Sequence, residues 1–590
     1  MNANEAPTAA YPADQGIHHL FAAQAQRTPD SVAAVCGNQF ITYGELNSRA
    51  NQLARHLHSI GVRRYDPVAI LMNRGIHCLI SLLAALKAGA TYVPIELTLP
   101  PRRMAYILTD SDIRYALIDE QAHALIDQID IPVLRFVAVE SPGLYQGEDT
   151  DPGLPFDNQQ PVYCIYTSGS TGTPKGVMVH HQGLVNYVWW ARKQYVSDDI
   201  SAFALYSSLS FDLTITSIFV PLIGGLCIHI YPDLPDGTPA IHRVIADNQV
   251  DVLKLTPSHL ALLENMDLAQ SRLKVLILGG EDLKTATAAA IHARLQGRAI
   301  LYNEYGPTET VVGCMLYRFD PAKDVRGSVP IGRPIDNMRI QLLDDAMQPV
   351  TPGDVGEIYI GGDGVALGYK NNPDATARAF RRDPERARST LYASGDLGRI
   401  GAEGQLQFLG RKDSQIKLRG YRIELGEVES VLLSHPDITA CTVTLTQHDV
   451  QLCAYYVAQA EIPAAALREL MATSLPEYML PAYFVHLDTL PLTPNGKVNR
   501  QALPGPERKT ASDRGTGPRS AVEEELIQLW KKVLAVDHVG LEDNFFAMGG
   551  QSLTALLLLR KITDTFRRTV SIQSFSRTPT IAGLSKQLES

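Results

Sequence analysis

Two patterns of apolar positions alternate along residues 30–410. Short apolar runs that end at glycine or turn residues are typical of buried strands, as in "DPVAILM" (66–72) and "LKVLILGG" (273–280). Between such runs, apolar residues recur at helical spacing, as in residues 42–62 and 77–90. The alternation predicts an α/β fold of several sheets covered by helices, and ligands in such folds bind at loops that follow strands.

The pattern changes after about residue 412. A short helix over 426–436, two paired strands and another helix over 463–476 predict a small α+β unit. Residues 503–520, "LPGPERKTASDRGTGPRS", have no apolar period, which is typical of a linker.

The final 70 residues predict a small helical bundle of the four-helix type. Ser520 and Glu523 form a capping box, followed by apolar residues at helical spacing. Further helices are predicted over 552–566 and 581–590.

Composition excludes several classes of protein. At 590 residues the chain is too long for one hydrophobic core, and its net charge of −10 argues against nucleic-acid binding. No apolar run approaches the roughly 18 residues of a membrane-spanning helix, and the N-terminus lacks a signal peptide. The sequence has no H-E-x-x-H motif or Cys/His cluster, so no structural metal is expected. These features predict a cytoplasmic protein without membrane or nucleic-acid partners.

The stretch "TSGSTGTPKG" (167–176) has the character of a phosphate-binding loop. Its glycines allow close approach of the backbone to an anion, its hydroxyls can donate hydrogen bonds, and Lys175 adds positive charge. It is not the P-loop of ATPases, because Gly176 follows the lysine where that motif requires Ser or Thr.

Further motifs follow in a fixed order. They include "NEYGPTET" (303–310), "YASGDLGRI" (392–400), "GRKDSQIKLRGYRIELGEVE" (410–429) and "TPNGKVNR" (493–500). With the 167–176 loop, these motifs resemble the adenylation domains of nonribosomal peptide synthetases, within the superfamily of adenylating enzymes. The resemblance covers about residues 16–503, and "DNFFAMGGQSL" (543–553) resembles the peptidyl carrier protein that follows such domains.

The resemblance implies an order of domains. It comprises an N-terminal tail (1–15), a large adenylation core (16–411), a mobile small subdomain (412–503) with its hinge near Asp413, a linker (504–519) and a carrier protein (520–590). It also implies that an amino acid is joined to the α-phosphate of ATP, with release of pyrophosphate. The aminoacyl group then passes to a 4′-phosphopantetheine thiol on Ser552. Gln551 stands where the family usually has His or Asp, which bears on recognition by other proteins.

The resemblance assigns the nucleotide-binding residues. The phosphate loop would comprise Thr167, Ser168, Gly169, Ser170, Thr171, Gly172 and Lys175. The AMP and ATP contacts would be Gly280, Asn303, Tyr305, Gly306, Thr308, Asp396, Phe408 and Arg411. In these roles Tyr305 covers adenine, Asn303 meets its amine, and Asp396 binds the ribose. Ala393–Ser394 departs from the Arg or Lys that the family usually has two positions before Gly395. Glu309 would hold Mg²⁺ through ATP, and Lys497 would be the catalytic cation between carboxylate and α-phosphate.

The amino-acid pocket also follows from the resemblance. Its positions fall on Asp212, Leu213, Thr216, Lys254, Ile277, Gly279, Glu304, Val312, Gly313 and Lys497. Asp212 would pair with the α-ammonium group. Lys254 and Glu304 together present one donor and one acceptor, which complement a carboxamide. We therefore expect asparagine, then aspartate or glutamine; alternatively, Lys254 and Glu304 form a salt bridge that never contacts substrate.

Two other functions compete with amino-acid adenylation. An acyl- or aryl-CoA ligase shares the phosphate loop but needs neither Asp212 nor a fused carrier, and a degenerate scaffold would not retain Lys497, Asp396, Glu309 and Ser552. The expected partners are the amino acid, a phosphopantetheinyl transferase and a downstream condensation or tailoring enzyme. The need for a small MbtH-like helper protein is left open.

Overall fold

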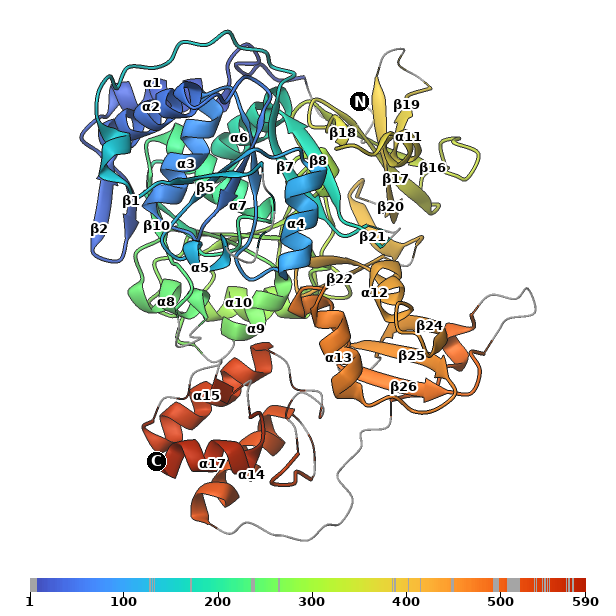
Figure 1. Cartoon of the computed structure of the whole chain (residues 1–590). Coiled ribbons are helices and arrows are strands. Elements are labelled where there is room, and N and C mark those ends of the chain that lie inside the picture. The colour runs from blue at the N-terminus through green and yellow to red at the C-terminus, as the bar shows by residue number, and fades with distance from the viewer. Residues whose placement is uncertain are drawn as a thin grey trace. The chain divides into compact units, whose positions relative to one another are not determined.

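The computed structural model describes residues 8–126, 129, 131, 133–169, 172–234, 239–263, 266–384, 386, 389–401, 403–413, 415–446, 450–491, 498–506, 520–534, 536, 538–543, 545, 548, 550, 552–568, 570, 574–575 and 578–589. The chain divides into two compact units (Figure 1). The first contains Met1–Gly169, Thr173–Pro232 and Val244–Ile423, and the second contains Ser170–Gly172, Asp233–Arg243 and Glu424–Ser590.

A seven-stranded sheet lies in the first unit, with strand order β18-β8-β7-β4-β3-β5-β6. Its strands are β3 (Pro67–Leu71), β4 (Thr91–Pro94), β5 (Tyr115–Ile118), β6 (Arg135–Ala138), β7 (Pro161–Thr167), β8 (Lys175–His180) and β18 (Gly368–Tyr369). Pairing is parallel between β3 and β4, β3 and β5, β4 and β7, and β5 and β6, whereas β7 and β8 form an antiparallel hairpin. The hairpin loop is the predicted phosphate loop.

A nine-stranded sheet in the same unit has the order β15-β14-β13-β12-β11-β9-β10-β1-β2. Its strands are β1 (Val32–Cys36), β2 (Gln39–Thr42), β9 (Ala202–Leu205), β10 (Cys227–Ile230), β11 (Val252–Leu255), β12 (Val275–Gly279), β13 (Ile300–Tyr305), β14 (Met315–Arg318) and β15 (Arg333–Pro334). The central strands β9 to β13 pair in parallel. The predicted α/β class and the multi-sheet core are confirmed.

Helices pack with these sheets in one large apolar core. Those with residues in this core include α1 (Ile17–Arg27), α2 (Tyr43–Ser59), α3 (Ile76–Lys87), α6 (His181–Tyr195) and α7 (Leu213–Gly224). A second apolar core contains residues of α4 (Pro101–Asp110) and packs against α5 (His123–Ile126). The remaining helical elements in this part of the sequence are α8 (Ala240–Asp247), α9 (Pro257–Leu263), α10 (Thr285–Arg294) and the 3₁₀ turns η1 (Pro142–Tyr145) and η2 (Thr308–Thr310). The Thr42 hydroxyl caps α2 by accepting a hydrogen bond from the Glu45 amide. Helix α2 lies within the range that the apolar periodicity predicts, and α3 begins one residue before its predicted range of 77–90.

A third sheet and a hairpin complete the first unit. The sheet contains β16 (Met338–Leu343), β17 (Gly356–Gly362), β19 (Phe380–Arg382), β20 (Thr390–Ile400) and β21 (Leu406–Arg411), beside α11 (Pro373–Ala379). Strands β22 (Gln415–Leu418) and β23 (Tyr421–Glu424) form the hairpin. The hairpin follows Asp413 directly in the chain.

The second unit contains an α+β part and a helical part. The α+β part has β24 (Ile438–Leu445), β25 (Leu452–Ala458) and β26 (Tyr483–Leu487), with α12 (Leu425–Leu432), α13 (Ala464–Ala472) and the turns η3 (Glu477–Met479) and η4 (Arg500–Ala502). The helical part contains α14 (Ala521–Leu534), α15 (Ser552–Phe566) and α17 (Ile581–Glu589).

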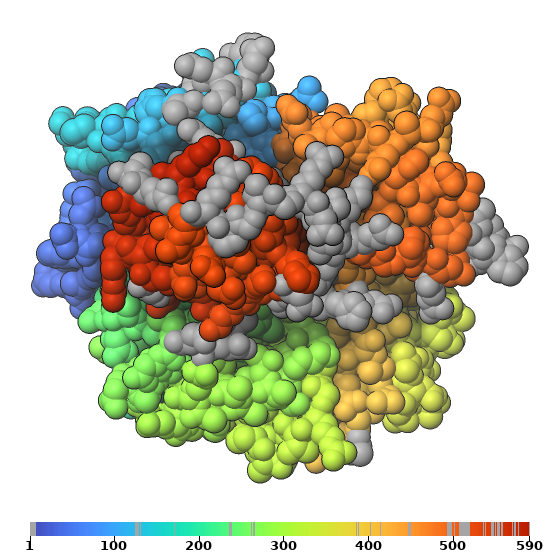
Figure 2. All heavy atoms as spheres, turned by 90° about the horizontal axis from the view of Figure 1, so that it is seen from below, coloured from blue at the N-terminus to red at the C-terminus, as the bar shows by residue number. Residues whose placement is uncertain are grey.

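The helical part has its own apolar core, in which Trp530, Phe545 and Phe575 pack edge to face. Its described atoms form one compact body in the space-filling view (Figure 2). The Ser520 hydroxyl accepts a hydrogen bond from the Glu523 amide at 3.2 Å, as the capping box predicts. Among the helices in the described part of the chain, none is both long and apolar enough to cross a membrane.

Candidate active site

Four of the residues predicted to line the amino-acid pocket lie on three adjacent parallel strands, β11, β12 and β13. In their register, Lys254 lies opposite Ile277, and Gly279 lies opposite Glu304. A Cβ atom at Gly279 would lie 2.9 Å from the carbonyl oxygen of Glu304, so the strands need glycine here. The register therefore brings residues that are 50 positions apart in the chain to one end of the sheet.

Lys254 and Glu304 form a buried ion pair. The Nζ atom of Lys254 also donates to Thr216 Oγ1 at 2.8 Å and to the Tyr187 hydroxyl at 3.1 Å. The other carboxylate oxygen of Glu304, Oε1, accepts hydrogen bonds from the Tyr187 and Tyr195 hydroxyls, each at 2.8 Å. All five side chains are at most 4 % exposed, so these contacts replace water as hydrogen-bond partners.

Tyr187 and Tyr195 lie on α6 and were missed by the sequence analysis. Their eight-residue spacing in "GLVNYVWWARKQY" places them on one side of α6, but aromatic residues at such spacing usually belong to the apolar core. Burial raises the pKa of both hydroxyls well above 10, and the negative charge of Glu304 raises it further. Both tyrosines therefore remain protonated donors toward the carboxylate.

Asp212 precedes the first turn of α7. Burial raises the pKa of its carboxyl group to about 6, although a hydrogen bond from Thr308 and the charge of Lys254 act in the opposite direction. Its Oδ2 atom is buried and has no hydrogen-bond partner among the described residues. A buried acceptor without a partner is costly, so this oxygen is suited to receive a donor from a ligand.

Two valines and a glycine border Glu304 after the turn η2. Val311 and Val312 have φ values of 58° and 61°, a left-handed conformation that β-branched residues rarely adopt. A Cβ atom at Gly313 would lie 2.6 Å from the carboxylate carbon of Glu304. Backbone strain of this kind is concentrated at functional sites, and here it occurs in the two residues before Gly313, which lies next to Glu304.

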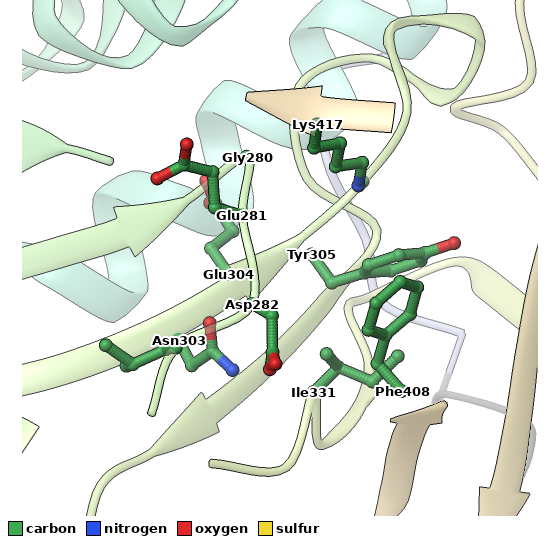
Figure 3. Close-up of a pocket in the computed structure, with 11 residues that line it drawn as sticks. Gly280, Glu281, Asp282, Asn303, Glu304, Tyr305, Ile331, Phe408 and Lys417 are labelled. Carbon is green, nitrogen blue, oxygen red and sulfur yellow. The ribbon is translucent and has the colours of Figure 1, made fainter. Parts of the chain in front are cut away.

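A cavity of about 370 Å³, including its open mouth, is lined by several of the predicted nucleotide-binding residues. It is lined by Gly280, Glu281, Asp282, Leu283, Asn303, Glu304, Tyr305, Gly306, Ile331, Phe408 and Lys417. Figure 3 shows the Tyr305 and Phe408 rings next to each other, with Lys417 extending toward Tyr305. Its Nζ atom lies 5.3 Å from the centre of the Tyr305 ring and 5.8 Å from that of Phe408.

Asn303 meets this cavity with its acceptor atom available. Its Nδ2 group donates to the carbonyl oxygens of Val329 at 3.1 Å and Pro330 at 2.9 Å. Both amide hydrogens are thereby used, and Oδ1 remains as an acceptor. The exocyclic amine of adenine is a donor, so the side chain is oriented as the adenine role requires.

The predicted ribose contacts form one hydrogen-bonded group. Tyr305 donates to Asp396 Oδ2 at 2.6 Å, and Arg411 pairs with Oδ1 of the same carboxylate. Arg411 also binds Asp413 through Nη2 at 2.7 Å. The Ser394 hydroxyl accepts from the Asp396 amide at 3.0 Å, so the residue that departs from the family pattern orients Asp396.

The phosphate loop joins β7 to β8 with Thr167 opposite Lys175. A Cβ atom at Gly169 would lie 1.9 Å from the Thr173 carbonyl oxygen, which only glycine avoids. The Ser168 hydroxyl donates to the Arg422 carbonyl oxygen at 2.6 Å. Gly172 has a φ of 86°, and Ser170 and Thr171 lie outside the described residues.

The β22–β23 hairpin supplies a cation to Glu309. Arg422 Nη1 lies 2.6 Å from Glu309 Oε2, and the Tyr369 hydroxyl donates to Oε1 at 2.7 Å. Burial acts to raise the pKa of Glu309, but the charge of Arg422 and this hydrogen bond outweigh it and hold the pKa below its usual value. The Gly420 amide of the same hairpin donates to Glu281 at 2.6 Å.

Lys417 on β22 was not assigned a role from the sequence. Burial lowers the pKa of its ammonium group, against the opposing influence of Asp396, and Arg411 adds to the lowering. It belongs to the motif "GRKDSQIKLRGYRIELGEVE" (410–429), whose sequence does not indicate which of its side chains enters the cavity.

The side chains of two further predicted residues are not described by the structure. Lys497 lies outside the described residues. Ser552 is the first residue of α15, as expected for a residue at a helix start, and its side chain is outside the description.

Three family models match the chain in succession. The AMP-binding enzyme model matches residues 21–370, the AMP-binding enzyme C-terminal domain model matches residues 427–497, and the phosphopantetheine attachment site model matches residues 524–588. The chain belongs to the AMP-binding enzyme family. It is an ATP-dependent adenylating ligase of the nonribosomal peptide synthetase type, followed by a carrier domain.

Relatives support the same assignment for this adenylating enzyme. It is 43% identical over 586 residues to bacitracin synthase 3 of Bacillus licheniformis, and 41% identical over 588 residues to tyrocidine synthase 3 of Brevibacillus parabrevis. Both alignments cover 98% of this chain but only 9% of each relative, so the chain spans a small part of each. Holo-PA1221, a synthetase protein with adenylation and carrier domains whose structure holds a vinylsulfonamide inhibitor, has a TM-score of 0.80 at 25% identity, with 97% of this chain and 96% of that chain covered.

Proposed function

We propose that this adenylating enzyme activates L-asparagine and loads it onto its own carrier domain. A carboxylate oxygen of asparagine attacks the α-phosphorus of ATP, the bond to the bridging oxygen of pyrophosphate breaks, and asparaginyl-AMP and pyrophosphate form. The observation that carries the proposal is the unpartnered, buried Oδ2 atom of Asp212 near the neutral Lys254–Glu304 pair.

Asp212 selects an amino acid over other carboxylic acids. An α-ammonium group would supply the missing hydrogen bond and the opposite charge for the Asp212 carboxylate. An acyl or aryl acid would leave the buried Oδ2 atom of Asp212 without a hydrogen-bond partner, which argues against the acyl- or aryl-CoA ligase alternative.

The hydrogen-bond count favours a carboxamide side chain. The three ammonium hydrogens of Lys254 are directed at Glu304, Thr216 and Tyr187, so none remains for a substrate. Glu304 Oε1 has two donors, whereas Oε2 has Lys254 and room for one more. The NH₂ group of asparagine can donate to this remaining position.

Aspartate fits the same count poorly. Its carboxylate cannot donate to Glu304 Oε2, meets it as a like charge, and finds the Lys254 donors already used. Glutamine carries the right amide but one more methylene, which such pockets discriminate by about 1–3 kcal/mol. The Lys254–Glu304 pair therefore offers the substrate mainly a hydrogen-bond acceptor, Glu304 Oε2. The sequence had led us to expect one donor and one acceptor.

We assign nucleotide binding to the cavity lined by Asn303, Tyr305 and Phe408 and to the phosphate loop. Adenine would lie against Tyr305 with its amine toward Asn303, the ribose would bind the Asp396 carboxylate, and Thr308 would lie near the α-phosphate. Residues 167–172 and Lys175 would hold the β- and γ-phosphates.

Magnesium, which is general for this family, would reach the site with ATP. Among the described residues, no group of three or more His, Cys, Asp or Glu side chains could hold a metal alone. The buried, ionised Glu309 fits as one ligand once Arg422 leaves its Oε2 atom. The ion would neutralise charge on the phosphates as pyrophosphate departs.

Transfer requires a second arrangement of the active site. Lys497 would neutralise charge between the carboxylate and the α-phosphate during adenylation, and rotation near Asp413 would then exchange it for the β22–β23 hairpin. Phosphopantetheine on Ser552 would supply the thiol that accepts the asparaginyl group.

The carrier domain implies partners beyond this chain. A phosphopantetheinyl transferase must modify Ser552, and downstream synthetase domains must receive the cargo. We propose that these include a condensation or tailoring enzyme, that an MbtH-like protein is a candidate helper, and that the enzyme acts in the cytoplasm in the biosynthesis of a nonribosomal peptide or amino-acid-derived product.

The test is amino-acid-dependent ATP–pyrophosphate exchange across the proteinogenic amino acids. We expect the highest rate with asparagine, weak rates with aspartate and glutamine, and loss of exchange in Lys497→Ala. A preference for aspartate would overturn the pocket assignment but keep the enzyme class. Exchange driven by acids that lack an α-amino group would overturn the role of Asp212.

A further inference from the structure

The two tyrosines of α6 bind the same carboxylate oxygen but differ in their other contacts. Tyr195 has one side-chain hydrogen bond among those of the described residues, which it donates to Glu304 Oε1 at 2.8 Å. Tyr187 donates to the same oxygen at 2.8 Å and also contacts Thr216 Oγ1 at 2.6 Å and Lys254 Nζ at 3.1 Å. Neither tyrosine is one of the ten pocket positions.

The direction of each hydrogen bond follows from counting protons. A carboxylate only accepts, so the single hydroxyl hydrogen of Tyr187 goes to Glu304. The Tyr187 oxygen must therefore accept from both Thr216 and Lys254. Thr216 in turn donates to Tyr187 and accepts from Lys254 at 2.8 Å.

The Tyr187 oxygen consequently occupies the third ammonium hydrogen of Lys254. Without it, Lys254 would retain its bonds to Glu304 and Thr216 and would have one donor left over. A spare ammonium hydrogen in a buried pocket is what an anionic side chain needs in order to bind.

We propose that Tyr187 is a positioning residue that sets substrate specificity, by occupying Lys254 so that the pocket accepts a carboxamide and rejects a carboxylate. This inference rests on the proposed function. Tyr195 orients Glu304 but leaves the donors of Lys254 unchanged, so the two tyrosines act differently on specificity.

The experiment compares Tyr187→Phe with Tyr195→Phe as its matched control. Each variant removes one hydroxyl from Glu304 Oε1, but only Tyr187→Phe frees a Lys254 hydrogen. ATP–pyrophosphate exchange is measured with asparagine and aspartate, and kcat and KM are obtained separately for each amino acid.

We expect Tyr187→Phe to raise the aspartate-to-asparagine ratio of kcat/KM by about tenfold, mainly through a lower KM for aspartate, since one charge-assisted hydrogen bond is gained. Tyr195→Phe should leave that ratio within about twofold of wild type, although it raises the KM for asparagine. Equal shifts of the ratio in both variants, or no shift in Tyr187→Phe, would overturn the inference.

A third variant guards against a folding defect. Thr216→Val keeps the side-chain shape and removes the other neutral acceptor of Lys254, so it should shift the ratio in the same direction as Tyr187→Phe. If thermal unfolding shows that Tyr187→Phe does not fold, Thr216→Val replaces it in the experiment. An unchanged aspartate-to-asparagine ratio of kcat/KM in Thr216→Val would then overturn the inference.

Failure of the proposed substrate is recognised separately. Wild-type enzyme that does not favour asparagine overturns the proposed function before any variant is compared. Wild-type enzyme that favours asparagine, with no difference between the two tyrosine variants, overturns only the role of Tyr187.

Discussion

Glu304 and Glu309 are buried carboxylates only five residues apart, yet their surroundings differ. Each binds one cation and receives hydrogen bonds from tyrosine hydroxyls: Lys254 with Tyr187 and Tyr195 for Glu304, and Arg422 with Tyr369 for Glu309. Lys254, the cation of Glu304, lies on β11, two strands away in the same sheet, and the Lys254 side chain is 3% exposed. The cation of Glu309 comes from the β22–β23 hairpin, and its side chain is 20% exposed.

This difference separates a fixed ion pair from an exchangeable one. Strand pairing holds Lys254 in place, because its register with β12 is set by backbone hydrogen bonds. Arg422 lies on a short two-stranded hairpin that directly follows the proposed hinge. The first arrangement suits the proposed role of Glu304 in a pocket that selects a substrate, and the second suits the proposed role of Glu309 as a ligand of Mg²⁺.

The largest expected effect is on stability. Lys254→Met should lower the free energy of unfolding by about 3–5 kcal/mol, because it leaves the buried Glu304 charge without its cation. The double variant Lys254→Met/Glu304→Gln should recover part of this loss. Chemical denaturation of the three proteins measures both effects.

Lys193→Met is the control for this experiment. Lys193 pairs with Asp336 on the surface, so its removal should cost about 0–1 kcal/mol. Equal losses in Lys193→Met and Lys254→Met would contradict the distinction between buried and exposed pairs.

The next effect concerns Asp212, a buried carboxylate in the same region. With a pKa of about 6, its ionised form decreases as the pH falls, so the KM for asparagine should rise about tenfold between pH 7 and pH 5. The KM for ATP, measured in the same assays, should change much less. A KM for asparagine that is flat over this range would contradict ionic pairing with the α-ammonium group.

The sign for folding is opposite. The folded-state pKa of Asp212 lies above its ordinary value of 3.8, so the folded state binds the extra proton between pH 6 and pH 4. The contribution of Asp212 to stability therefore increases as the pH falls through this window.

The smallest expected effect tests the exchangeable pair. Arg422→Gln removes the cation that competes for Glu309 Oε2, so half-maximal exchange should require about threefold less Mg²⁺. Arg399→Gln is the control, since Arg399 is bonded to the neutral Gln407 on the surface. A higher Mg²⁺ requirement in Arg422→Gln would show that the arginine assists the metal instead.

The sequence predicted the fold better than it predicted the contacts within the site. Apolar periodicity located α2, α3 and the central strands, because burial repeats at the period of each element. The resemblance to adenylation domains, and not the apolar periodicity, assigned Asp212 and Lys254 to the pocket. Tyr187 and Tyr195 escaped notice because a helical pattern shows which side of α6 is buried but not where a hydroxyl points.

Other contacts depend on tertiary structure in the same way. The pairing of Arg422 with Glu309 joins positions 113 residues apart, so no local pattern could indicate it. Which charged side chain of the motif that contains Arg422 reaches Glu309 depends on how the two-residue turn between β22 and β23 twists the hairpin and where the hairpin lies.

Gly313 gives this pocket a route by which its relatives could evolve new preferences. A Cβ atom at Gly313 would lie 2.6 Å from the Glu304 carboxylate carbon, so a single added methyl group would force the carboxylate to move. Such a change alters the depth of the pocket while every charge and hydroxyl stays in the chain. A change in the preferred length of the substrate side chain can therefore begin with a substitution at Gly313, while Lys254 and Glu304 both remain in the chain.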